Sequence, residues 1–196
     1  DQPQSDFLQG VRALADEVGA VLIIDEISAG FRINTGGAHL KLGVVPDIAV
    51  FSKAMGNGYP IAAIIGKNKV MEAAQSTFIS STMWTERIGP VAALTTINKY
   101  RELDVSQHLI RIGEQVQQGW KQCALNQGLK IHTDGIPPLS HFTFEYESAL
   151  KMKTLFVQLM LERGFLASTI FYAMFAHQLD HVEVYLGAAN DSFALI

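Results

Sequence analysis

Two short stretches decide the fold of this 196-residue chain: residues 22–26, which read LIIDE, and residues 48–60, which read IAVFSKAMGNGYP. In each stretch an apolar run typical of a buried strand leads into a charged residue, Asp25 in the first and Lys53 in the second. A glycine-bearing loop joins the two runs, and an Asn-Gly turn leads to a third apolar run at residues 61–65. Strands ordered in this way deliver the carboxylate and the amine to the same rim of a sheet.

A lysine and a carboxylate on one rim suit a pyridoxal phosphate enzyme. The lysine holds the aldehyde as a Schiff base, and the carboxylate keeps the pyridine nitrogen protonated, so that the ring can accept the electrons of a substrate carbanion. Lys53 is flanked by residues of the buried type, where an unpaired ammonium would be costly. Two alternatives stay open: a solvated surface residue for Lys53, and a helix N-cap or a Mg²⁺ ligand for Asp25.

Composition narrows the class of protein. The chain is 48% hydrophobic and 17% charged, which is an ordinary globular balance, and its formal net charge of -4 with scattered Lys and Arg gives no reason to expect nucleic acid. No apolar stretch reaches the ~18 to 20 residues that span a bilayer, so we expect no membrane partner. The single cysteine, Cys123, fits a reducing compartment, and we expect a cytoplasmic protein.

Hydrophobic periodicity predicts two regions. Residues 1–100 combine helices with buried strands, and residues 101–196 form a compact α+β unit. We expect helices at residues 7–18, 90–100, 109–120, 149–163 and 179–193, and strands at residues 20–24, 48–51, 61–65, 129–132 and 141–145.

Beyond these patterns, the amino-acid sequences of four segments resemble those of a known family. Residues 25–32 (DEISAGFR), 46–48 (PDI), 52–60 (SKAMGNGYP) and 80–90 (SSTMWTERIGP) closely resemble the class III pyridoxal-phosphate aminotransferases, within them the glutamate-1-semialdehyde aminomutase-like branch. The resemblance extends to residues 175–177. It implies an α/β chain of fold type I, with part of a large domain built on a mostly parallel sheet, followed by a C-terminal α+β small domain.

The resemblance also implies roles for individual residues. Lys53 would be the internal aldimine and the proton shuttle, and Asp25 the partner of the pyridinium nitrogen. Ile27, two residues after Asp25, would pack against one face of the ring. Thr85 best matches the threonine that reaches the cofactor phosphate of the neighbouring subunit, which implies a homodimer.

The phosphate contact has open alternatives. Thr82 or Ser81 could serve in place of Thr85, because the family usually has a shorter Gly/Asn-Pro sequence where this chain has residues 85–90. All three residues could instead simply cap the helix that begins near Pro90.

Three further residues are weaker candidates. Arg32 could bind a substrate carboxylate, although an arginine after a glycine loop more often pairs with a local acid. His177 and His181 have metal-ligand spacing on a helix, but no third ligand accompanies them, and we expect no metal.

The family also has a glycine-rich phosphate loop and a ring-covering aromatic residue upstream of the aspartate strand, and neither is present here. We therefore expect this chain to correspond to the second half of a longer polypeptide. The function expected is transfer of an amino group between a small-molecule amino acid or amine and a carbonyl compound. Alternatives are an intramolecular aminomutase, an amino acid racemase or epimerase, and a catalytically silent folding or dimerisation module.

Overall fold

The chain divides into two compact units. The computed structural model describes residues 5–80, 82–83 and 85–196. The N-terminal unit ends at Ser106 and the C-terminal unit begins at Gln107, so all but the first two residues of the helix α4 (Val105–Asn126) lie in the C-terminal unit. Assignment of residues 1–100 and 101–196 to the large and small domains of the family stays a prediction.

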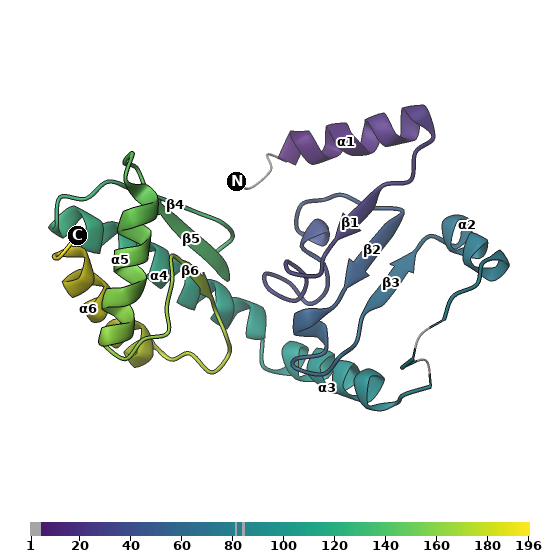
Figure 1. Cartoon of the computed structure of the whole chain (residues 1–196). Coiled ribbons are helices and arrows are strands. Elements are labelled where there is room, and N and C mark those ends of the chain that lie inside the picture. Colours follow the sequence, from purple (N-terminus) through teal and green to yellow (C-terminus); the bar gives the residue numbers. More distant parts are fainter. Residues whose placement is uncertain (1–4, 81, 84) are drawn as a thin grey trace. The chain divides into compact units, whose positions relative to one another are not determined.

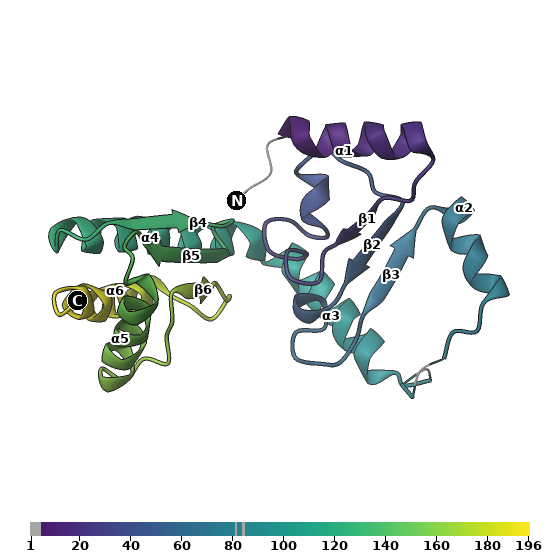
Figure 2. The same cartoon turned by 45° about the horizontal axis from the view of Figure 1, so that its top comes forward.

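The N-terminal unit is built around a three-stranded sheet (Figure 1). In Figure 2 the arrows of β1 and β2 point the same way and that of β3 points the opposite way, because β1 and β2 are parallel and β2 and β3 antiparallel. The elements of this unit are, in order, α1 (Ser5–Val18), β1 (Ile23–Asp25), the 3-10 helix η1 (Ala38–Leu40), β2 (Ile48–Phe51), the 3-10 helix η2 (Lys53–Met55), β3 (Ala63–Gly66), α2 (Asn68–Met71), the 3-10 helix η3 (Glu72–Ser76) and α3 (Ile88–Glu102).

The first strand differs from the expectation. We expected a buried strand at residues 20–24, but β1 begins at Ile23, whose side chain is 57% exposed. Within the described residues β1 pairs only with β2, and Ile64 of β3 is also exposed. A parallel strand is buried only when layers cover both faces of its sheet, and the described part of the chain does not supply them here.

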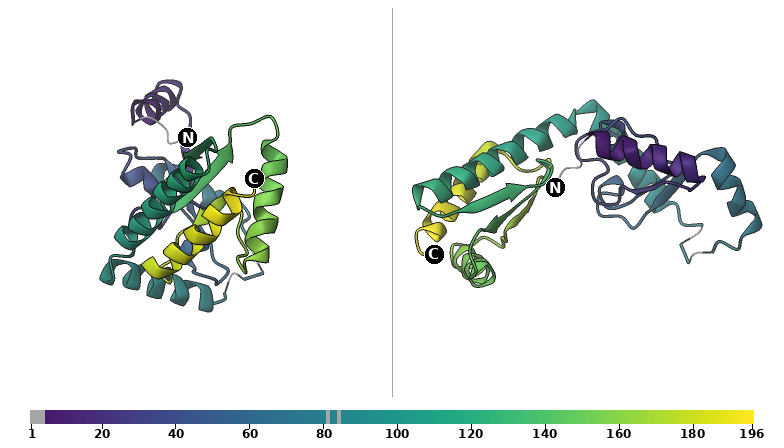
Figure 3. Two further views of the ribbon diagram at one scale, coloured as in Figure 1. Left: turned by 90° about the vertical axis from the view of Figure 1, so that its left-hand side faces the viewer. Right: turned by 90° about the horizontal axis from the view of Figure 1, so that it is seen from above.

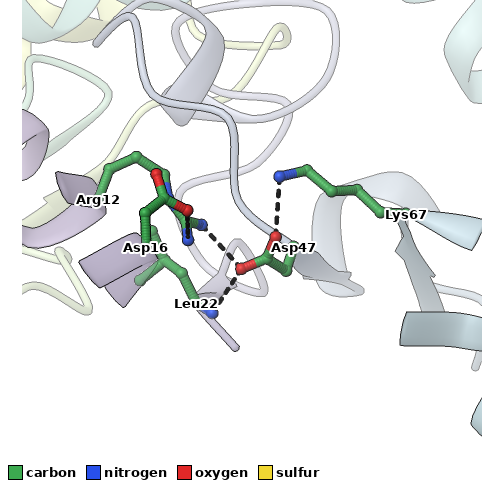
Figure 4. A network of polar contacts seen from close by, with 5 residues as sticks. All are labelled: Arg12, Asp16, Leu22, Asp47 and Lys67. Atoms are coloured by element: carbon green, nitrogen blue, oxygen red, sulfur yellow. Dashed lines mark hydrogen bonds and ion pairs between the residues drawn. The ribbon is translucent and has the colours of Figure 1, made fainter. Parts of the chain in front are cut away.

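An ion-pair network fixes the edge of this sheet at which the parallel strands begin (Figure 4). Asp47, immediately before β2, accepts hydrogen bonds from Lys67 Nζ, from the backbone N–H of Leu22 and from Arg12 Nη1, each at 2.8 Å. Arg12 also binds Asp16 one turn further along α1. Because these donors favour the charged carboxylate, they hold the pKa of Asp47 far below its ordinary value. The network joins α1 to the starts of β1 and β2.

The C-terminal unit contains a second sheet, in which β5 pairs antiparallel with both β4 and β6. Strand β6 was not expected from the sequence. The two views of Figure 3 show α4 and α6 running alongside each other, with Gly119 of α4 against Leu186 of α6. The elements of this unit are α4 (Val105–Asn126), β4 (Ile131–Asp134), β5 (Leu139–Phe144), α5 (Ala149–Glu162), β6 (Ile170–Tyr172) and α6 (Leu179–Phe193).

Aromatic side chains fill the centre of this unit. Phe142 of β5 lies with its ring centroid 4.9 Å from that of Trp120, 5.4 Å from that of Phe156 and 5.6 Å from that of Phe193. The indole N–H of Trp120 donates to the hydroxyl of Tyr185 at 2.9 Å, which satisfies a polar group inside the core. Each of the three helices therefore contributes an aromatic anchor to one cluster.

None of the helices in the described part of the chain combines the length and the apolar character needed to cross a bilayer.

Candidate functional site

The carboxyl ends of β1 and β2 bring the two principal candidates together. Asp25 is the last residue of β1 and stands beside Val50 in the parallel ladder. Lys53 follows Val50 by three residues and opens the η2 turn directly after β2. Parallel neighbours end at the same edge of a sheet, so the expected delivery of both groups to one rim is confirmed in the backbone.

Lys53 has an unusual backbone conformation. Its φ is 44°, in the left-handed region that disfavours side chains with a Cβ atom. The Nζ atom donates to the hydroxyl of Ser28 at 2.6 Å. The side chain is exposed, so the argument that burial makes its charge costly is wrong. Phe51 and Met55 on either side turn into the interior, whereas the η2 turn directs Lys53 outward.

Asp25 is held by the chain that follows it. Its Oδ1 accepts the backbone N–H of Ile27 at 2.8 Å, a local contact that fixes the carboxylate relative to the strand end. Ile27 is half-buried but lies in a turn, because β1 ends at Asp25. Strand alternation therefore does not set the direction of the Ile27 side chain, and its contact with a cofactor ring stays a prediction.

Directly after Asp25, a buried carboxylate anchors the long loop between the strands. Glu26 is 1% exposed, and its Oε1 accepts both the backbone N–H of His39 at 2.9 Å and a hydrogen bond from His39 Nδ1 at 2.7 Å. A Cβ atom on Gly37 would lie 2.7 Å from the same oxygen, so only glycine fits there. The Glu26 side chain thus faces the interior and holds the loop through His39, whereas the neighbouring Asp25 side chain is exposed.

Arg32 lies in the same loop. Its Nε donates to the carbonyl oxygen of Ser28 at 3.3 Å, and its own carbonyl accepts the hydroxyl of Tyr100 at 3.0 Å. These contacts brace the turn that carries Ser28. A role for Arg32 in binding a substrate carboxylate stays a prediction.

Thr85 is exposed in the segment ahead of α3. Thr82 is exposed as well, and Ser81 lies outside the described residues. The side chain that binds the first N–H groups of α3 is Glu86, whose carboxylate accepts from Ile88 and, at 2.9 Å, from Gly89.

The contact of Glu86 with the start of α3 affects two predictions for residues 81–85: that they cap this helix, and that one of them binds the cofactor phosphate. In the described residues, the side-chain contacts at this helix start come from Glu86 and not from a threonine hydroxyl. A phosphate bound at the same N–H groups would have to displace the Glu86 carboxylate, because both are anions. The phosphate contact of Thr85 stays a prediction.

His181 lies in the first turn of α6, but His177 lies two residues before this helix, so the expectation that both share one helix is wrong. Both side chains bind backbone N–H groups. His177 Nδ1 accepts the N–H of Met174, and His181 Nδ1 accepts the N–H of Gln178, each at 3.1 Å. Both line a pocket of about 310 Å³ together with Phe171. Burial lowers the pKa of His177. Across the described residues no cluster of three metal-ligating side chains occurs.

Sequence reasoning missed three residues of this site: Ser28, Glu26 as an anchor, and His39 as its partner. Ser28 and Lys53 are 25 positions apart, and Glu26 and His39 are 13 apart. The one available signal was the pair of glycines ahead of His39, which indicates a close approach of the backbone.

Comparison with known proteins identifies the family of this chain. Residues 2–170 match the model of the class-III aminotransferase family. The chain therefore belongs to this family, whose fold is that of the fold type I enzymes that use pyridoxal phosphate.

Individual relatives carry different names. The chain is 28% identical to the aminopentol aminotransferase of Sphingopyxis macrogoltabida over 98% of its length and 46% of the relative's. It is 33% identical to the glutamate-1-semialdehyde 2,1-aminomutase of Roseiflexus castenholzii over 99% of its length and 49% of the relative's. The chain thus spans about half the length of these curated relatives.

Solved structures give the same picture. The FumI protein of Sphingopyxis sp. MTA144, in its internal aldimine form with pyridoxal phosphate, superposes with a TM-score of 0.92 at 27% identity, over 98% of this chain and 47% of that one. An omega-transaminase from Sphaerobacter thermophilus superposes with a TM-score of 0.87 at 22% identity, over 97% of this chain and 48% of that one. The fold expected from the sequence is confirmed.

Proposed function

We propose that this chain supplies the lysine and carboxylate part of the site of a pyridoxal-phosphate-dependent aminotransferase. The protein would move an amino group between a small-molecule amino acid or amine and a carbonyl compound, in the cytoplasm and as a homodimer. The observation that carries the proposal is the parallel register of Asp25 with Val50, which puts Asp25 and Lys53 at one sheet edge.

The residues present fit the cofactor. Its aldehyde requires an accessible primary amine, and Lys53 is exposed with its Nζ held by Ser28. Its ring nitrogen requires a carboxylate, and Asp25 is exposed at the adjacent strand end. When bound, the cofactor supplies the electron sink for the substrate carbanion.

Each residue then has a defined task. Lys53 would attach the cofactor and afterwards carry the proton between the two carbon atoms that exchange it. Asp25 would hold a proton on the ring nitrogen, and Ile27 would pack against one ring face. Thr85 would donate to the phosphate in the site of the partner subunit. The assignment of residues 1–100 and 101–196 to the two domains of the family belongs to the same proposal.

Trapping with borohydride tests the proposal. The purified chain is mixed with pyridoxal phosphate, reduced and digested, and the labelled peptide is identified by mass spectrometry. We expect the label on Lys53 and none in Lys53→Ala, which should stay folded because the strand and turn frame does not depend on the amine. A label on Lys67 or Lys69 in place of Lys53 would show the assignment to be wrong.

The subunit contact of Thr85 needs its own experiment. If two sites are shared across a homodimer, mixing Lys53→Ala with Thr85→Ala gives heterodimers in which one site carries both defects and the other carries neither. Activity should then return on subunit exchange. A mixture that stays as inactive as its components would place Thr85 in the site of its own subunit.

A second candidate is an intramolecular aminomutase, favoured by relatives named glutamate-1-semialdehyde 2,1-aminomutase at 33% and 34% identity. A racemase or epimerase on the same scaffold is a further alternative. An aminotransferase requires a second, carbonyl-bearing substrate, whereas a mutase or racemase converts a single substrate. Turnover measured with and without an added keto acid separates the two classes.

A further inference from the structure

We propose that Ser28 is a positioning residue for the amine of Lys53. This inference rests on the proposed function for its consequence, but the contact itself does not depend on a cofactor. Ser28 Oγ accepts from Lys53 Nζ at 2.6 Å, across 25 positions of sequence. A lysine side chain has four carbons and many rotamers, so a single fixed acceptor removes much of its freedom.

The turn that carries Ser28 is itself held in place. The carbonyl oxygen of Ser28 accepts from Arg32 Nε, and the carbonyl oxygen of Arg32 accepts from the hydroxyl of Tyr100, a buried residue of α3. The backbone N–H of Gly30 donates to the carbonyl oxygen of Glu26 at 2.8 Å, which closes the turn. Ser28 is thus tied to the helix behind the sheet, and its hydroxyl is a fixed point rather than part of an unsupported loop.

The same turn also fixes the carboxylate. Asp25 accepts the N–H of Ile27, one residue before Ser28. One four-residue segment therefore holds both groups of the site, the carboxylate through its backbone and the amine through its serine hydroxyl. Any shift of this segment moves Asp25 and the acceptor of Lys53 together, which preserves their relation.

The consequence concerns the attachment of pyridoxal phosphate. The nitrogen of Lys53 would first lose one proton to solvent and then bond to the aldehyde carbon, while the carbonyl oxygen would leave as water with the two remaining hydrogens of the amine. Holding the nitrogen in the reacting direction should speed this step. Ser28 would fix the direction of the Lys53 side chain, and Lys53 would supply the nitrogen atom that reacts.

Rates of attachment test the inference. The chain is mixed with pyridoxal phosphate, samples are trapped with borohydride over time, and the label on Lys53 is quantified by peptide mapping. We expect Ser28→Ala to slow attachment five- to tenfold, about the value of one ordinary intramolecular hydrogen bond. Ser28→Thr keeps the hydroxyl and should remain within about twofold of the original chain. Ser76→Ala is the matched control, because the Ser76 hydroxyl donates to the carbonyl oxygen of Ala73 in its own turn on η3.

A cofactor-free measurement separates this inference from the proposed function. In ¹H–¹³C NMR spectra, a held lysine shows two distinct Hε signals, and a freely rotating one shows them merged. We expect distinct signals for Lys53, assigned by their loss in Lys53→Arg, in the original chain and in Ser28→Thr, and merged signals in Ser28→Ala.

The outcomes divide as follows. Distinct signals without any label on Lys53 would support the positioning role of Ser28 and contradict the proposed function. Equal attachment rates and unchanged signals in Ser28→Ala would overturn the positioning role. Equal losses in Ser28→Ala and Ser28→Thr would overturn it too, because the hydroxyl would not be the cause.

Discussion

The two units of this chain differ in what they bury. The C-terminal unit closes around side chains that are at most 1% exposed, namely Trp120, Phe142, Phe156 and Phe193. The buried aromatic side chains of the N-terminal unit, Phe31, Phe51 and Tyr100, remain 6–7% exposed, and its strand residues Ile23 and Ile64 are more than half exposed. The N-terminal unit also contains every non-glycine residue with positive φ in the described part of the chain: Phe31, Lys53, Asn57 and Asp104.

This difference separates stability from chemistry. Apolar burial is the main source of folding free energy, and the aromatic side chains of the C-terminal core are more completely buried. The unit with the exposed amine and carboxylate instead relies on polar contacts and holds its lysine in a strained conformation. Strain at a functional position persists only where the surrounding structure enforces it. Four pairs of substitutions test this difference, and the expected effect decreases from the first pair to the last.

The core of the C-terminal unit should be the most sensitive. Phe156→Ala removes a side chain with no exposed surface, and we expect a loss of about 3–5 kcal/mol in the free energy of unfolding. Leu150→Ala on the same helix is the control, since that side chain is 80% exposed and its removal should cost about 0.5 kcal/mol or less. Urea denaturation followed by Trp120 fluorescence, in a Trp84→Phe background, gives both values. Similar losses would remove the contrast between the units.

The ion-pair network should dominate the stability of the N-terminal unit. Asp47→Asn is expected to lower the thermal midpoint at neutral pH, because it removes the charge shared by Lys67 and Arg12. A carboxylate with a lowered pKa stabilises the fold above its unfolded value of 3.8, and this contribution is lost as the pH falls through the folded value. The gap between Asp47→Asn and the original chain should therefore narrow below about pH 3.8.

Asp16→Asn is the matched control for this network, since Asp16 is exposed and, within the described residues, forms an ion pair with Arg12 alone. Its midpoint should stay close to that of the original chain at neutral pH. Equal effects of the two substitutions would mean that the salt bridges and not the buried geometry of Asp47 set the stability.

A smaller effect is expected at the start of α3. Glu86→Ala leaves the N–H groups of Ile88 and Gly89 without their carboxylate, which should cost about 1 kcal/mol. Thr85→Ala should change the stability by less than about 0.5 kcal/mol. Chemical denaturation of the two variants compares them directly. A larger loss for Thr85→Ala would contradict the assignment of the cap.

The smallest effect concerns Lys53. A left-handed residue with a Cβ atom costs about 1–2 kcal/mol, and part of this is offset because glycine adds about 0.4–1 kcal/mol of entropy to the unfolded chain. Lys53→Gly should thus be more stable than Lys53→Ala by roughly 0.5 kcal/mol. Denaturation curves of the two variants, which both lack the amine, isolate the backbone contribution. An advantage for alanine would show that the backbone relaxes once the amine is gone.

Sequence patterns predicted the helices well where side-chain periodicity is set by packing. The last helix was expected at residues 179–193 and is found there, because one apolar face contacts the core over its whole length. Strand β6 was missed because three residues are too few to show an alternating pattern.

The site was predictable as far as strand ends determine it. Asp25 and Lys53 follow apolar runs, so their meeting at one edge could be read from the sequence. The exposure of Lys53 and its contact with Ser28 could not, because both depend on a left-handed turn and on a loop that closes across 25 residues. The pairing of Glu26 with His39 was hidden for the same reason.

That pairing has a consequence for how this protein family can diversify. Neighbouring strands place Asp25 and Lys53 through their hydrogen-bond ladder, so the length of the connecting loop is not fixed by the chemistry. The later part of the loop is held where Glu26 binds His39. Insertions at residues 33–35 should be tolerated, since bends there precede this contact. Evolution could remodel that rim for new substrates without moving the two reactive groups.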